Sequence, residues 1–326
     1  MKNSESIILV ISTILWRANN FMLTPDEIRT ITIKSLFSDD NISEIITLKG
    51  GNALSLLDIS DRASVDIDFS VRENIRLSKE VEGALFFEVL ERGFLECGYH
   101  VIDYNFSERP EKRRRTLPPF WGGYKIEFKL LDKIKREKIL RENTDFKKIE
   151  QKESVSSEVI DPTRNGKKIE IDLSFDEYTR DSKQIDVEGV SVYIYSPVMI
   201  IYEKMRALCQ QMPEYELRSS GVRARDLHDI YMTIFNPKDE DMSRDFLLES
   251  ENLEILKEIF STKEVPLELL NNMAQEKEKL KDDYKLNVMQ QINKKDAVDF
   301  DYLFEYVQFI MEDIYEKINR QDTGLS

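Results

Sequence analysis

The sequence predicts an α/β core followed by a mostly helical C-terminal part, and two observations support this prediction. Up to about residue 209, short β-branched or alternating apolar runs are separated by stretches in which apolar residues recur at helical spacing. Beyond residue 237, helical spacing alone recurs, in the stretches 247–260, 267–285 and 302–318. We therefore expect a core domain at 1–196 and a helical domain at 197–326.

The composition restricts the classes of function. With 326 residues, of which 41% are hydrophobic, the chain can bury a core of ordinary size. The net charge of −15 argues against broad, charge-driven binding of nucleic acid, so any such contact must come from local patches. Cys97 and Cys209 cannot form a disulfide framework, which favours a reducing, cytoplasmic location. Only His100 and His228 are present, so carboxylate-bound Mg²⁺ is more available than a multi-histidine zinc site.

The N-terminal part predicts three helices. The apolar run 7–15 is too short to cross a bilayer, so we expect a helix there and no membrane span. Thr24, Pro25 and Glu27 form a helix start, with a hydroxyl cap, a proline in the first turn and a glutamate three residues beyond the cap. Helical spacing returns at 78–97.

Further strands are expected at 101–106, 124–130 and 190–195. After the last of these, Ser196 and Pro197 predict the cap and first turn of another helix. The charged stretch 132–168 predicts an exposed helix followed by a loop.

A glycine turn is the first feature that indicates chemistry. The apolar run 45–48 predicts a buried strand that ends at Gly50 and Gly51, where the backbone can approach a ligand closely. Asn52 is positioned to cap a short helix at 53–57, whose first N–H groups would suit phosphate.

Two aspartates follow the turn. In a strand, Asp66 and Asp68 project from one face while Ile67 and Phe69 pack into the core. Their Cα atoms would lie roughly 6.5 Å apart, which lets two carboxylates hold one or two metal ions.

Arg62 and Ser64 share the parity of the aspartates, so a guanidinium and a hydroxyl would lie beside a bound triphosphate. The alternative is a surface hairpin with an acidic outer face. The combination of the glycine turn with the paired aspartates favours a nucleotide site.

These segments resemble the first motif of the AbiEii/AbiGii-type nucleotidyltransferase toxins, a branch of the DNA polymerase β-like superfamily. The resemblance rests on Lys-Gly-Gly at 49–51, Ala-Leu at 53–54 and Arg-x-Ser-x-Asp-Ile-Asp-Phe at 62–69. Later segments, Glu-Lys-x-x-Ala-Leu at 203–208 and Arg-x-Arg-Asp-Leu-x-Asp at 223–229, are similar to further family motifs. Asn52 replaces the usual small hydroxyl residue, and 59–61 lacks a glycine often found there.

The resemblance, which spans about 24–234, implies an α/β nucleotidyltransferase core with a mixed β-sheet flanked by helices. The helical C-terminal domain would complete the active-site groove. It also implies transfer of a nucleotide from an NTP to an acceptor hydroxyl, such as the 3′ end of tRNA, with release of pyrophosphate. The setting would be a toxin–antitoxin or phage-defence (abortive infection) system, with a cognate antitoxin as partner.

The resemblance assigns a role to each motif. Asp66, Asp68 and a third carboxylate would bind Mg²⁺. The strand at 169–175 alternates strictly, and on its polar face Asp172 is the expected third ligand and proton acceptor, with Glu170 in reserve. The remaining predicted site residues bind the nucleotide or complete the catalytic set: Gly50, Gly51, Asn52, Arg62, Ser64, Lys204 and Asp226.

Plainer readings remain open. Lys204 is compatible with a solvated helix position, and Arg223 and Arg225 with local ion pairs to Asp226 and Asp229. The basic cluster at 113–115 is either a solvated loop or a contact for RNA or triphosphate. Two other functions also remain: transfer to a protein side chain or small molecule, and a non-enzymatic binding subunit.

Overall fold

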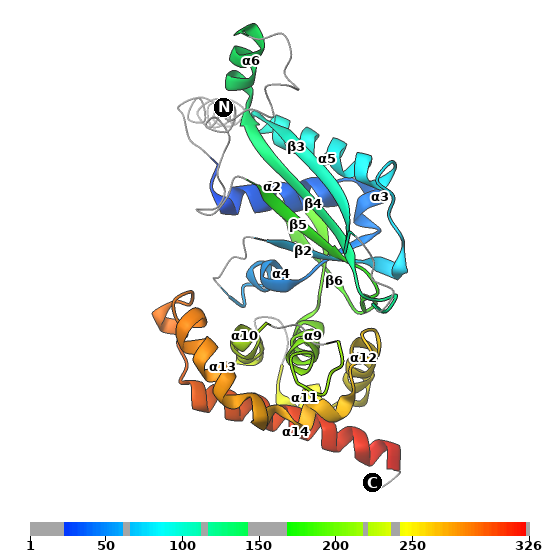
Figure 1. Ribbon diagram of the computed structural model, residues 1–326, viewed down its shortest axis with the longest axis vertical. Helices are drawn as coiled ribbons and strands as arrows, with labels where there is room; N and C mark the ends of the chain where they lie inside the picture. Colours follow the sequence, from blue (N-terminus) through cyan, green and yellow to red (C-terminus); the bar gives the residue numbers. More distant parts are fainter. Residues whose placement is uncertain are drawn as a thin grey trace, which may run out of the picture.

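The computed structural model describes residues 23–60, 66–111, 117–142, 168–217, 221–235 and 242–323. A β-sheet with its helices forms the upper part of the molecule in Figure 1, and a group of helices forms the lower part. The predicted boundary after Ser196 falls between the last strand and the first helix of the lower group, and it stays a prediction. The helix predicted at 7–15 lies outside the described residues.

Seven strands form one mixed sheet in the order β3-β4-β5-β2-β1-β7-β6. They are β1 (Ile46–Leu48), β2 (Ile67–Val71), β3 (Tyr99–Arg109), β4 (Gly123–Asp132), β5 (Ile169–Ser174), β6 (Lys183–Val187) and β7 (Val190–Ile194). The pairs β1–β7 and β2–β5 are parallel, whereas the other four neighbouring pairs are antiparallel. The predicted mixed sheet is therefore confirmed.

Strand β6 was not predicted from the sequence. It forms a hairpin with β7 through a turn at Gly189, where φ is +86°. Its polar residues Lys183, Gln184 and Asp186 leave Ile185 and Val187 as the apolar members, so the alternation is short. A short edge strand of this kind has a weak sequence signal.

One face of the sheet is covered by α2 (Pro25–Phe37) and α5 (Glu82–Glu96). The capping box at the start of α2 is confirmed, since Thr24 and Glu27 bond each other's backbone N–H groups. Phe37 packs on Phe69 of β2, with ring centroids 6.1 Å apart. Phe69 is fully buried on this face, which directs the even-numbered residues of β2 to the opposite face.

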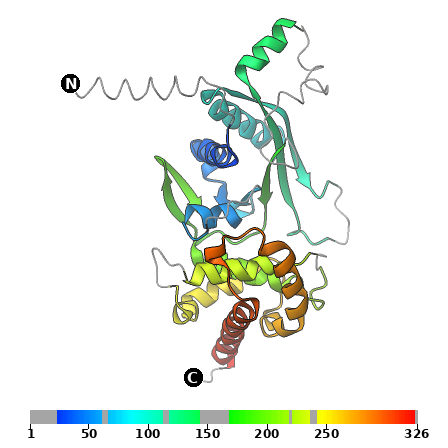
Figure 2. The same ribbon diagram turned by 90° about the vertical axis from the view of Figure 1, so that its left-hand side faces the viewer.

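Three further helices belong to the sheet-containing part of the molecule, two of them short and one exposed. They are α3 (Asp40–Ser43), α4 (Gly50–Leu56) and α6 (Lys133–Glu142). Helix α4 begins at Gly50 rather than after Asn52, and its N-cap residue is Lys49. The prediction that Asn52 caps this helix is wrong, because its side chain donates instead to the Asp66 carbonyl, at 2.7 Å. Figure 2 shows α6 projecting from the far end of the sheet.

The lower part is helical, as predicted. Its α-helices are α9 (Pro197–Cys209), α10 (Ala224–Phe235), α11 (Arg244–Leu247), α12 (Ser250–Ser261), α13 (Lys277–Asp283) and α14 (Phe300–Thr323). Short 3₁₀ or π turns lie at Leu267–Asn271, Met273–Glu276, Tyr284–Val288 and Lys294–Asp296. The continuous helix predicted at 267–285 is therefore wrong, because the asparagines at 271 and 272 favour a turn over a helix interior.

Helix α9 is nearly all buried and forms the centre of the lower group. Ser196 occupies its N-cap position, as predicted, but its hydroxyl makes no capping bond within the described residues. Tyr202 donates to the Leu247 carbonyl at 2.7 Å, and α14 contributes a buried apolar face below. No helix in the described residues is long and apolar enough to cross a membrane.

Candidate active site

Asp68 lies on the sheet face opposite α2, next to the glycine turn. The amide of Lys49 donates to the Asp68 carbonyl at 3.0 Å, which ties the turn to β2. Gly50 has φ +67°, and a Cβ added there would lie 2.7 Å from Asp68 Oδ2. Glycine is therefore required here because the backbone turns through the left-handed region against a carboxylate.

Asp172 is the neighbour of Asp68 across the sheet. Strands β2 and β5 are parallel, and their register pairs Asp68 with Asp172 and Ser70 with Ser174. Glu170, the reserve candidate, is instead bonded to Lys125 of β4, with 2.6 Å between Nζ and Oε2. Of the two candidates, the structure brings Asp172 beside Asp68.

Asp66 is exposed and precedes β2, with its backbone held by Asn52. Arg62 and Ser64 lie outside the described residues. Within the described part of the chain, no three carboxylate, histidine or cysteine side chains converge closely enough to form a complete metal site. The predicted trio of Asp66, Asp68 and Asp172 is thus adjacent in the fold without forming a closed ligand set.

The electrostatics of Asp68 show uncompensated negative charge. The pKa of Asp68 is raised to about 6, mainly by burial and also by Asp172, Asp66 and Glu203, while Lys49 opposes the shift. Burial is also the main cause that raises the pKa of Asp172, opposed by Lys125. Hard oxygen ligands with crowded negative charge fit a divalent cation such as Mg²⁺.

Lys49 forms an ion pair with Glu177. The Lys49 ammonium lies 2.5 Å from Glu177 Oε2 and 3.1 Å from the Ser174 hydroxyl. Glu177 also accepts from the Ser70 hydroxyl at 2.7 Å. The side chains of Lys49 and Glu177 are both nearly completely buried, and each is hydrogen-bonded to polar groups. Burial alone would raise the pKa of Glu177, but Lys49 and Lys263 hold it well below its usual range.

Lys204 lies in a buried ion-pair cluster between α9 and α10. Its ammonium contacts Asp226 Oδ1 at 3.0 Å and Asp229 Oδ2 at 2.7 Å, with 7% of the side chain exposed. Burial alone would lower the pKa of Lys204, but the two carboxylates raise it. The structure therefore places Lys204 where its ammonium joins two helices, and its predicted contact with the triphosphate stays a prediction.

Asp226 contacts both Lys204 and Arg223. Its carboxylate pairs with the Arg223 guanidinium as well as with the Lys204 ammonium. The predicted ion pair between Arg223 and Asp226 is therefore confirmed. The second predicted pair is wrong, since Asp229 pairs with Lys204 and Arg225 donates to Gln291. Burial opposes the shift, but the two cations lower the pKa of Asp226 to about 2.

Arg223, at the start of α10, is a cation of the helical part that interacts electrostatically with Asp68. Asp226 raises its pKa most, and Glu203 and Asp68 add to this effect. Nearly half of its side chain is exposed, at 46%, so the guanidinium is accessible to a ligand. Arg223 is thus an exposed cation that interacts electrostatically with Asp68 and Glu203.

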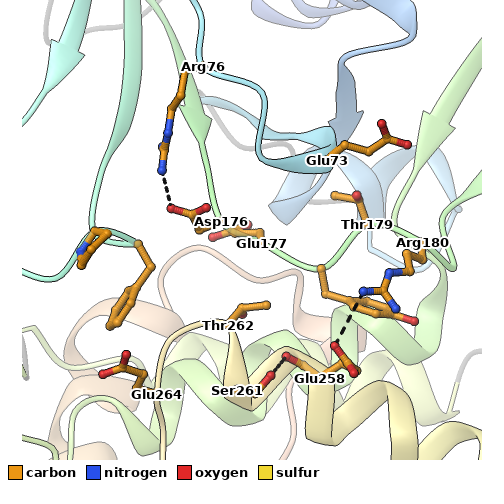
Figure 3. Close-up of a pocket in the computed structure, with 13 residues that line it drawn as sticks. Glu73, Arg76, Asp176, Glu177, Thr179, Arg180, Glu258, Ser261, Thr262 and Glu264 are labelled. Carbon is orange, nitrogen blue, oxygen red and sulfur yellow. Dashed lines mark hydrogen bonds and ion pairs between the residues drawn. The ribbon is translucent and has the colours of Figure 1, made fainter.

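A cavity of about 490 Å³ adjoins this region (Figure 3). Its sheet side carries an Arg76–Asp176 ion pair of 2.8 Å, and its helical side carries Glu258 at the end of α12, paired with Arg180 at 4.0 Å. Glu177 lines this cavity, and its carboxylate is bonded to Lys49.

Sequence reasoning missed several of these residues. Glu203 raises the pKa of both Asp68 and Lys49, Glu177 raises that of Lys49, and Asp68 raises that of Arg223, yet Glu203, Glu177 and Arg223 were not predicted as site residues. Glu203 and Arg223 lie in the segments 203–208 and 223–229, which resemble family motifs and contain the predicted site residues Lys204 and Asp226. Glu177 had no comparable signal, because it follows β5 in a loop with no regular spacing.

Comparison with known proteins defines the class. The family model described as "Nucleotidyl transferase AbiEii toxin, Type IV TA system" matches residues 33–306. The chain therefore belongs to the AbiEii family of nucleotidyltransferase toxins, of type IV toxin–antitoxin systems. The family implies an antitoxin partner and transferase chemistry that generally uses a divalent metal ion and an NTP.

Two crystal structures from Helicobacter pylori are similar in overall structure. JHP933 matches with a TM-score of 0.45 and 16% identity, over 92% of this chain and 94% of that chain. A candidate nucleotidyltransferase matches with a TM-score of 0.44 and 15% identity, over 91% and 96% of the two chains. The comparison with curated proteins gave no match.

Proposed function

We propose that this chain transfers a nucleotide from an NTP to an acceptor hydroxyl, most simply the 3′ end of tRNA, and releases pyrophosphate. The observation that supports the site is the register of β2 and β5, which sets Asp68 beside Asp172 on the sheet face away from α2. Carboxylates on neighbouring strands can together hold the pair of metal ions that stabilises the attacking and leaving oxygens in nucleotidyl transfer.

Asp66, Asp68 and Asp172 would hold Mg²⁺, and the charge crowding at Asp68 fits such an ion. When bound, the metal would neutralise charge on the phosphates and orient the α-phosphorus for in-line attack. Gly50 leaves room for the Asp68 carboxylate, while Gly51, Asn52, Arg62 and Ser64 remain proposed nucleotide contacts from the resemblance.

Asp172 is proposed to accept the proton of the attacking hydroxyl. Burial raises its pKa, which makes it a better proton acceptor than an exposed aspartate. Lys125, which lies opposite in β4, limits that shift.

Arg223 is proposed to bind the triphosphate, because it is exposed and electrostatically linked to Asp68. In this proposal Lys204 and Asp226 act as positioning residues, since the buried Lys204–Asp226 contact fixes the carboxylate that holds the guanidinium. A planar guanidinium suits bidentate phosphate contacts.

The acceptor is tested by supplying each NTP, labelled at the α-phosphate, with Mg²⁺, total RNA and protein extract. Label in tRNA that is absent with Asp66→Ala would support the proposal. Label in protein would preserve the reaction and replace the acceptor. If no NTP gives transfer in the presence or absence of the cognate antitoxin, the proposal is wrong.

A further inference from the structure

A buried polar cluster lies directly behind the carboxylates, on the same sheet face. Asp68 and Ser70 are two residues apart on β2, and the Ser70 hydroxyl donates to Glu177. Glu177 lies 3.3 Å from the Tyr195 hydroxyl, which also contacts Ser70. The cluster therefore adjoins the proposed cation site without being part of it.

The balance of charge in this cluster depends on Lys49. Its ammonium is bonded to Glu177, and Glu203, Asp68 and Asp172 also interact with it electrostatically. Asp68 and Asp172 are carboxylates of the proposed site. If Glu177 were neutral, Lys49 would be a buried cation near these remaining carboxylates.

We propose that Glu177 is a positioning residue that holds the Lys49 ammonium away from Asp68 and so leaves the site carboxylates available to a divalent cation. This inference rests on the proposed function. Without Glu177, Lys49 would neutralise Asp68 from within the protein and compete with the metal ion. No group is transferred in this role, which consists only of holding a charge in place.

A second cation connects this arrangement to the helical part. Lys263, just after α12, donates to the Phe120 carbonyl at 3.1 Å and the Phe175 carbonyl at 2.9 Å. Its ammonium is also 3.9 Å from Glu177 Oε1. Glu177 is thus fixed from the helical side as well as from the sheet, which suits a residue that must hold Lys49 in one place.

The test measures Mn²⁺ binding to the full chain by electron paramagnetic resonance. Glu177→Gln keeps the shape of the side chain and removes its charge. We expect it to weaken Mn²⁺ binding by about tenfold or more, because a unit charge brought within a few ångströms of the ion costs at least that factor. Glu258→Gln, on the wall of the same cavity, is the matched control and should bind Mn²⁺ like wild type.

Substitution of Lys49 tests whether its charge is what weakens Mn²⁺ binding in Glu177→Gln. In Glu177→Gln with Lys49→Met, both charges are absent, and we expect Mn²⁺ affinity to return to that of Lys49→Met alone. A simple loss of packing would leave the double variant as weak as Glu177→Gln. Equal affinity of Glu177→Gln and wild type would also overturn the proposal.

The cavity offers a chemical rescue. Because Glu177 lines the cavity and is bonded to Lys49, we expect formate to occupy the space that its carboxylate leaves in Glu177→Ala. Formate should restore part of the Mn²⁺ affinity of this variant, whereas sodium chloride at equal ionic strength should not. Lack of rescue would contradict the role of the carboxylate charge.

Two further comparisons keep the result decisive. If Glu177→Gln does not fold, Glu177→Asp carries the test: its shorter side chain should weaken Mn²⁺ binding, and unchanged binding overturns the inference. Asp68→Asn separates this inference from the proposed function. Loss of Mn²⁺ binding in Asp68→Asn but not in the Glu177 variants contradicts the inference alone, whereas equal binding by Asp68→Asn and wild type contradicts the metal site itself.

Discussion

Replacing Asp68 by asparagine should stabilise the metal-free protein. Burial raises the pKa of Asp68 from 3.8 to about 6, so the folded state binds its proton more tightly than the unfolded state. The stability that this group contributes is complete below pH 3.8 and is lost as pH rises through 6. This difference between the two pKa values corresponds to a penalty of roughly 3 kcal/mol above pH 6.

Asparagine has no charge to bury, so Asp68→Asn should be more stable than wild type by up to about 3 kcal/mol at pH 8. At pH 5 the difference should fall to roughly half, because wild-type Asp68 is then mostly protonated when folded. With an unfolding entropy of about 2.1 cal/mol/K per residue, the difference at pH 8 corresponds to roughly 4 °C in Tm.

The assay is urea unfolding in EDTA at several pH values, with exposed Asp282→Asn as the control. The control should follow wild type at every pH. Saturating Mn²⁺ should then reverse the order, since an ion that binds only the folded wild type stabilises it. Equal stability of Asp68→Asn and wild type at pH 8, or a difference independent of pH, would refute the reasoning.

Three other predictions follow from the same contacts. Gly50→Ala should lose more stability in urea than Gly189→Ala, because both have positive φ but only at Gly50 would the added Cβ meet a carboxylate; equal losses would contradict that contact. Arg223→Ala should raise the KM for NTP about tenfold or more, as expected for a lost charged contact, while Arg225→Ala should not; matching KM values would contradict the assignment. Burial lowers the pKa of Lys263 to about 8, so wild type should gain about 3 kcal/mol of stability relative to Lys263→Met as pH rises from 8 to 10.5; a flat difference would contradict this burial.

Local signals were sufficient for much of the core. The capping box before α2 and the alternation in β5 depend on residues close in sequence, and both elements were found where expected. The parity argument also held for β2, where Ile67 and Phe69 are buried. These are the features that spacing along one element can determine.

Features that depend on two elements were harder to predict. The register that sets Asp172 rather than Glu170 beside Asp68 is a property of paired strands, and spacing in one strand cannot reveal it. The contacts of Lys204 with Asp226 and Asp229 of the next helix were likewise not predicted, whereas its role at the triphosphate stays a prediction. A buried ion-pair partner of this kind is visible only after two helices are packed together.

The central claim is nucleotidyl transfer by the paired carboxylates of β2 and β5. It is tested most directly with tRNA and an NTP labelled at either the α- or the γ-phosphate. We predict that wild type and Glu170→Gln move the α-label into RNA and release the γ-label as pyrophosphate, whereas Asp68→Asn and Asp172→Asn do neither. Transfer of the γ-label, or full transfer by Asp172→Asn, would contradict the account.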